Sequence, residues 1–211
     1  MLSTCWLFCL HSAVQLKPSG LGSETVWIIG DGHVRNAAQR AAVTKGCHLS
    51  LPNTVIRWFG RASLRWEGLV PFFNESLRGR AVPDILLINC GGNDLGVLKS
   101  VKMVNVMRED LLQLHQLHPR MKIIFSALPQ RRQYSGKLEK ARKFVNSVMR
   151  TLMEQVQGAA VDHPNIRYDN QELFMKDGAH FSLKGYDIFI DNLTNCLKTA
   201  AVGVNNNKLT T

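Results

Sequence analysis

The sequence has 211 residues, of which 45% are hydrophobic and 20% are charged, and this composition excludes a disordered or collagen-like protein. A chain of this length can bury about 70% of the surface it exposes when unfolded, so we expect one domain with one sizeable core. Lys and Arg number 26 and Asp and Glu number 16, which gives a net charge of +10.

The two ends of the chain differ in composition from its middle. Residues 5–10 (CWLFCL) are apolar, but no basic residue precedes them and His11 interrupts the stretch, so they make a poor signal peptide. We expect a flexible segment at 1–22, the folded domain at 23–202 and a disordered tail at 203–211. No run is long enough to cross a membrane, so no membrane partner is expected. Five cysteines without a CxxC pair favour no zinc site and an intracellular, most simply cytoplasmic, location.

Segments typical of strands and of helices alternate along the chain. Continuous apolar runs predict strands that are buried on both faces, and apolar residues spaced by three and four predict amphipathic helices. The predicted strands are 25–29, 55–58, 85–90, 122–126 and 165–168. The predicted helices are 33–45, 63–77 with Ser63 as its cap, 99–118, 138–156 and 183–199. This alternation predicts an α/β protein, a flavodoxin-like three-layer α/β/α sandwich with a mostly parallel sheet of about five strands.

Polar motifs lie where such a sheet binds ligands, beyond the carboxyl ends of its strands. Residues 30–33 (GDGH) follow the first strand, 91–94 (GGND) follow the third, and 177–180 (DGAH) precede the last helix. The first motif lacks the third glycine of a dinucleotide site, because Arg35 stands at that position. We therefore expect no nucleotide cofactor.

Two of these motifs allow both a catalytic and a plain interpretation. Asp177 and His180 are three residues apart, so the carboxylate could orient the imidazole and leave its second nitrogen as a base; the alternative is a helix-capping loop. The Asn93 amide could donate to a developing oxyanion, or the Gly-Gly-Asn segment could simply form a turn.

Taken in order, these motifs resemble the SGNH hydrolase family, also called the GDSL esterases. That family has Gly-Asp-Ser after the first strand, then a Gly, then Gly-x-Asn-Asp, and finally Asp-x-x-His. The corresponding residues here are Gly30-Asp31-Gly32, Gly60, Gly91-Gly92-Asn93-Asp94 and Asp177-Gly178-Ala179-His180. The resemblance covers about residues 25–200. The segments 27–30, 93–96 and 177–182 also resemble esterase-like domains of fish retroelements and of proteins derived from them.

The resemblance implies hydrolysis of a small acyl or acetyl ester through a covalent intermediate, without a cofactor or a metal. His180 would be the general base, oriented by Asp177. The oxyanion hole would use the N–H groups of Gly32 and Gly60 and the side chain of Asn93.

The family's serine nucleophile falls on Gly32, which has no hydroxyl. Loss of the nucleophile costs a serine hydrolase about 10⁶ in kcat. The resemblance therefore implies an esterase-like domain that is inactive or strongly impaired. The sequence leaves open gene decay, an engineered change, or a binding role that still uses the pocket.

The positive charge is concentrated in one window. Residues 120–150 hold nine basic residues and one acidic residue, Glu139, so this window carries 9 − 1 = +8 of the +10. The alternative function is a non-catalytic binding module of retroelement origin that uses this basic surface, residues 120–150, to contact nucleic acid or another anion. The candidates are Arg131, Arg132, Lys137, Lys140, Arg142 and Lys143. One alternative is a solvated helix face, since no nucleic-acid-binding motif is present; another places residues 130–134 at the edge of the pocket, where they would act on an anionic substrate. The sequence leaves the oligomeric state open.

Overall fold

The computed structural model describes residues 23–207, and its centre is a single parallel sheet. The five strands lie in the order β2-β1-β3-β4-β5, and each pairs in parallel with its neighbours. Their bounds are β1 (Glu24–Gly30), β2 (Thr54–Gly60), β3 (Ile85–Asn89), β4 (Lys122–Ser126) and β5 (Ala159–Val161). The predicted parallel α/β sheet of five strands is confirmed.

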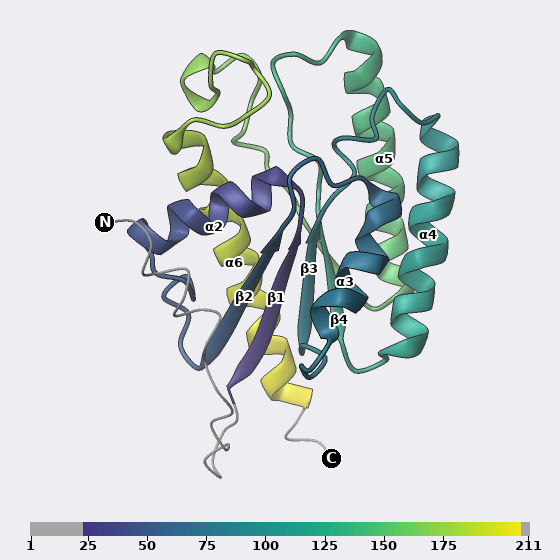
Figure 1. Ribbon diagram of the computed structural model, residues 1–211, viewed down its shortest axis with the longest axis vertical. Helices are drawn as coiled ribbons and strands as arrows, with labels where there is room; N and C mark the ends of the chain where they lie inside the picture. The colour runs from purple at the N-terminus through teal and green to yellow at the C-terminus, as the bar shows by residue number, and fades with distance from the viewer. Residues whose placement is uncertain (1–22, 208–211) are drawn as a thin grey trace.

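Helices cover both faces of the sheet (Figure 1). They are α2 (Gly32–Thr44), α3 (Leu69–Leu77), α4 (Ser100–Leu117), α5 (Gly136–Gln155) and α6 (Leu183–Asn207), with short 3-10 helices η1 (Trp66–Gly68) and η2 (Gln171–Leu173). Helices α2 and α6 pack on one face, and α3, α4 and α5 pack on the other. The result is the three-layer sandwich expected from the sequence.

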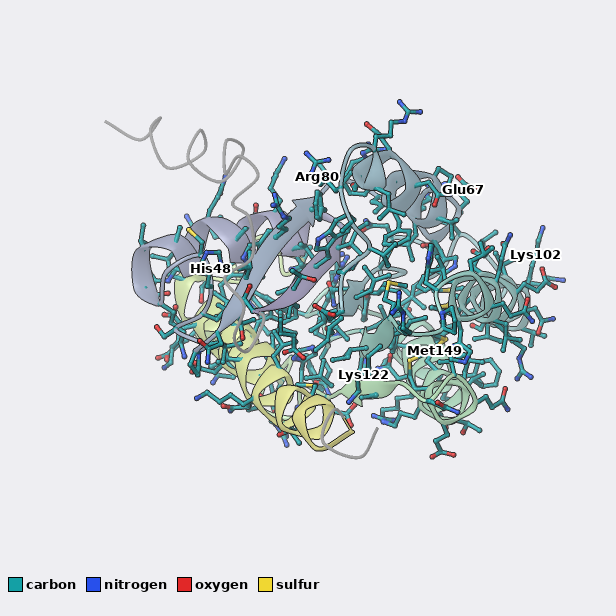
Figure 2. The ribbon with its side chains drawn as sticks, turned by 90° about the horizontal axis from the view of Figure 1, so that it is seen from below. His48, Glu67, Arg80, Lys102, Lys122 and Met149 are labelled. Atoms are coloured by element: carbon teal, nitrogen blue, oxygen red, sulfur yellow. The ribbon has the colours of Figure 1, made fainter. Side chains whose placement is uncertain are left out.

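The sheet separates two apolar cores. Successive side chains of a strand point to opposite faces. In β1, Trp27 and Ile29 therefore pack toward α3–α5, whereas Val26 and Ile28 pack toward α2 and α6. Because both faces are covered, β1 and β3 consist almost entirely of buried residues, which explains their continuous apolar sequences. Figure 2 shows the sheet between these layers, with the buried Met149 on α5.

Two predicted elements are wrong in detail. Residues 165–168 form turns and irregular backbone rather than the last strand, and β5 is instead the short segment Ala159–Val161. The apolar signal at Ile166 came from core packing, since this side chain is fully buried under α6. Ser63 caps no helix: its φ is 56°, and α3 begins only at Leu69, after η1.

Of the predicted terminal segments, the structure describes only part of the C-terminal one. Helix α6 continues to Asn207, into the stretch that we expected to be a tail. The remaining terminal segments, 1–22 and 208–211, lie outside the described residues, and so does the apolar stretch at 5–10.

Candidate active site

The predicted motifs meet at one edge of the sheet. Gly30 is in register with Gly60 on β2 and with Asn89 on β3, so the carboxyl ends of these three strands lie side by side. This edge is at the top of Figure 1, where the loop before α6 also lies. The fold therefore brings residues 30–33, 91–94 and 177–180 to the region where doubly wound sheets bind ligands.

Asp177 and His180 form a hydrogen-bonded pair. The Oδ2 atom of Asp177 lies 2.6 Å from Nδ1 of His180, and Oδ1 accepts the backbone N–H groups of Ala179 (2.9 Å) and His180 (3.0 Å). These hydrogen bonds, chiefly the one to the imidazole, lower the pKa of Asp177 to about 2. The carboxylate is thus ionised at neutral pH and can hold Nδ1–H, which leaves Nε2 as the nitrogen that can take a proton.

Gly32 is the first residue of α2, and the next residue, His33, lies close to this pair. Asp31 caps the helix, because its Oδ1 accepts the backbone N–H of His33 at 2.9 Å. The rings of His33 and His180 have centroids 6.1 Å apart, so the pair lies close to the start of α2. A Cβ atom added to Gly32 would meet no atom within 4 Å. A serine side chain therefore fits at this position without displacing a neighbour.

The residues predicted for the oxyanion hole have other contacts. The Nδ2 atom of Asn93 donates to the carbonyl of Leu64 at 3.0 Å and to Oδ2 of Asp31 at 3.3 Å. An oxyanion bound by this amide would have to replace one of these two acceptors. Gly60 ends β2 with its backbone pressed against Arg35 of α2. The oxyanion roles of Gly32, Gly60 and Asn93 stay predictions.

An open cavity of about 640 Å³ lies beside Asn93. Its walls come mostly from the loop between β2 and α3 and include Arg61, Ser63 and Arg65. Neither Gly32 nor His180 lines it, so Asn93 is the residue that this cavity shares with the predicted catalytic motifs.

Asp94 and His33 have structural partners that the sequence did not reveal. The buried carboxylate of Asp94 accepts the backbone N–H of Trp66 at 3.0 Å, and so it fastens the loop that leads into α3. His33 is buried, and its Nδ1 lies 3.4 Å from the Tyr186 hydroxyl. Burial lowers the pKa of His33 well below its usual value, so this ring is neutral. No sequence spacing signals either contact.

The basic window divides into exposed and buried residues. Arg142 is buried: Nε and Nη2 hold the Glu139 carboxylate at 2.7 and 2.6 Å, and Nη1 donates to the carbonyl of Leu128 at 2.8 Å. Arg131 is also buried, with 9% of its side chain exposed. The expectation that both lie on an exposed basic surface is therefore wrong: Arg142 is held by Glu139 and Leu128, and Nη2 of Arg131 lies 3.9 Å from Oδ2 of Asp31. The exposed candidates are Arg132, Lys137, Lys140 and Lys143, and their contact with nucleic acid stays a prediction.

Cys90, at the end of β3, is a buried thiol as expected, and burial raises its pKa well above the usual value. Among residues 23–207, no three His, Cys, Asp or Glu side chains gather as they would to bind a metal ion. In the same range, no helix combines the length and the apolar character that crossing a bilayer requires.

Alanine substitutions at Gly60 and at Gly32 should have opposite effects on the free energy of unfolding. A Cβ at Gly60 would lie 2.3 Å from the backbone nitrogen of Arg35, so Gly60→Ala must push α2 away from β2. We expect it to lower the free energy of unfolding by about 1–3 kcal/mol, the usual cost of overpacking. Gly32→Ala, which has free space, should raise it by about 0.4–1 kcal/mol through the lower entropy of the unfolded chain. Urea denaturation measures both, and equal stability of the two variants would contradict the close contact at Gly60.

Comparisons with known proteins support the fold. No protein-family model matches the sequence, and no curated protein does. The structure is similar to a lipolytic protein of the G-D-S-L family from Veillonella parvula, at 14% identity over 80% of this chain and 95% of that chain, with a TM-score of 0.64. It is also similar to Axe2, an acetylxylan esterase from Geobacillus stearothermophilus, at 16% identity over 83% of this chain and 94% of that chain, again with a TM-score of 0.64.

A further match is the esterase domain of the ORF1 protein from a zebrafish retrotransposon. It has 20% identity over 82% of this chain and 99% of that chain, but its TM-score of 0.43 is too low to support a closer relationship. The resemblance to fish retroelement domains therefore stays at the level of the sequence motifs. The architecture is shared over most of the chain with the first two proteins, and this chain has the three-layer α/β/α fold of the GDSL, or SGNH, hydrolases.

Proposed function

We propose that this chain is an SGNH-type esterase domain whose covalent chemistry is blocked at position 32. One observation carries the proposal: the site has room for a serine side chain at Gly32, beside an Asp177–His180 pair that is already hydrogen-bonded. In this proposal His180 is the base, Asp177 is the carboxylate that orients it, and the nucleophile is the missing part. The names of the structural neighbours, a lipolytic protein and an acetylxylan esterase, support an ester as the class of ligand.

The chemistry explains why this single position decides activity. In a serine esterase the hydroxyl oxygen attacks the acyl carbon, while the histidine takes the hydroxyl proton and later returns it to the leaving alcohol. At Gly32 there is no oxygen to form the acyl-enzyme. The remaining route is attack by a water molecule that His180 deprotonates. That water is not held by a covalent bond next to the acyl carbon, so this route lacks much of the advantage of an intramolecular nucleophile.

A fluorophosphonate probe tests the proposal directly, because it forms a covalent bond with an activated serine. Gly32→Ser is expected to gain labelling at residue 32, which mass spectrometry of the labelled peptide would locate. The unmodified chain is expected to show none at that position. If a correctly folded Gly32→Ser variant stays unlabelled at probe concentrations that label an active serine esterase, the proposed site is not a hydrolase site.

A further inference from the structure

Arg131 and Tyr134 each carry a buried polar atom without a hydrogen-bond partner among the described residues. These atoms are Nε of Arg131 and the hydroxyl oxygen of Tyr134. The nearest carboxylate oxygen to the Arg131 guanidinium, Oδ2 of Asp31, is 3.9 Å from Nη2, beyond hydrogen-bond distance. Only 9% of the Arg131 side chain is exposed. Buried polar groups are normally hydrogen-bonded, so this arrangement calls for a ligand or a specific role.

A tight turn brings the two side chains together. The N–H of Tyr134 donates to the carbonyl of Arg131 at 3.2 Å, and the guanidinium carbon lies 5.7 Å from the centre of the Tyr134 ring. The residues between them hold the catalytic loop, because the N–H groups of Arg132 and Gln133 both donate to the carbonyl of Gly178. The turn is thus attached to the loop that carries Asp177 and His180.

Both polar groups converge on Gly92, beside the predicted catalytic residues. A Cβ atom on Gly92 would lie 2.8 Å from Nη2 of Arg131 and 3.9 Å from the hydroxyl of Tyr134. Gly92 precedes Asn93, and Asp31 precedes Gly32. Because Gly92 has no side chain, the Arg131 guanidinium can lie against the backbone beside Asn93, near the predicted catalytic residues.

We propose that Arg131 and Tyr134 form a subsite for a carboxylate group next to Gly32. A guanidinium presents parallel N–H groups whose spacing matches the two oxygens of a carboxylate, and the phenol supplies a further donor. The neighbouring Asp31 favours a singly charged ligand over a phosphate dianion, because a second negative charge would be repelled at short range. The inference rests on the proposed function: the ligand would be an ester that carries a carboxylate a short distance from its acyl carbon, or the acid released from it.

The test is an NMR titration of the unmodified chain with sodium acetate, at constant ionic strength. We expect saturable shifts at the Arg131 Nε–H and at the backbone amides of Gly92 and Tyr134, with a millimolar Kd. Arg131→Gln should weaken binding by roughly 10-fold to 100-fold, since a hydrogen bond to a charged group is lost. Arg120→Gln removes an exposed arginine that precedes β4, at the opposite edge of the sheet, and is expected to leave the affinity unchanged.

Tyr134→Phe is the second variant, in case Arg131→Gln fails to fold. It keeps the ring, removes only the hydroxyl, and should weaken acetate binding several-fold. Equal shifts with sodium chloride or sodium phosphate, or no saturable shifts with acetate, would overturn the carboxylate subsite.

This result is separate from that of the proposed function. Acetate binding without labelling of Gly32→Ser would disprove the hydrolase site and keep the subsite. Labelling of Gly32→Ser without acetate binding would disprove the subsite and keep the hydrolase site.

Discussion

Gly32→Ser is expected to raise kcat for a short-chain nitrophenyl ester by several orders of magnitude, with an upper limit of about 10⁶-fold set by the cost of losing a serine nucleophile. The gain depends on geometry that already exists. Asp177 holds the imidazole of His180 at 2.6 Å, and the new side chain would enter space in which a Cβ meets no atom within 4 Å. The new side chain therefore fits without displacing a neighbour.

Three matched variants separate this result from a general effect on the pocket. Gly32→Ala adds a methyl group without an oxygen and should leave kcat at the level of the unmodified chain. In the Gly32→Ser background, His180→Ala should remove the gain, because the hydroxyl would then have no base. Asp177→Asn in that background should lower kcat by up to about 10⁴-fold, since the imidazole loses its orienting carboxylate. Equal kcat values for Gly32→Ser and Gly32→Ala would contradict the mechanism.

The sequence predicted the fold and the place of the site because these depend on local patterns. The strands β1 and β3 are buried on both faces, so their apolar runs are unbroken and easily found. Glycine, aspartate and histidine directly after such strands must lie at the carboxyl edge of a parallel sheet. The spacing of Asp177 and His180 allowed either a catalytic pair or a capping loop, and the 2.6 Å hydrogen bond between their side chains shows that they do pair.

The last strand and the burial of Arg131 could not be predicted, because they depend on contacts between segments that are distant in the sequence. β5 has three residues, too few to show a strand pattern, while Ile166 offers an apolar signal from a turn. Arg131 stands in a basic window and would be expected in solvent, yet the turn at 131–134 places it against Gly92, about 40 positions earlier in the sequence. Charge counting cannot distinguish such a residue from its exposed neighbour Arg132.

Acid is expected to destabilise the fold well above the pH at which carboxylates titrate, because His163 is buried in its neutral form. Its Nε2 lies 2.9 Å from Oγ of Ser126 and its Nδ1 lies 3.1 Å from Nδ2 of Asn192, while Phe189 packs against the ring. Burial lowers the pKa of His163 to about 4. The unfolded chain, with the ordinary histidine pKa of 6.5, therefore binds this proton more readily than the folded chain between pH 6.5 and 4.

The stabilisation from neutral His163 is therefore complete above pH 6.5 and is lost as the pH falls toward 4. At one pH unit per 1.36 kcal/mol, the free energy of unfolding should be about 2 kcal/mol lower at pH 5 than at pH 7.5 from this group alone. His33, whose pKa is also lowered by burial, acts in the same direction, whereas the raised pKa values of Asp31 and Asp94 oppose it.

Comparing the unmodified chain with His163→Gln isolates the histidine, because the other titrating groups are the same in both proteins. Urea denaturation at pH 5 and at pH 7.5 gives the four free energies. The amide keeps hydrogen-bonding capacity toward Ser126 and Asn192 but binds no proton, so the variant should be less stable at pH 7.5 and lose about 2 kcal/mol less on acidification. An unchanged pH dependence would show that the ring is already accessible to protons in the folded state. The same dependence also sets the working range for the Gly32→Ser assay, which belongs above pH 6.5, where the neutral ring keeps the end of β4 attached to α6.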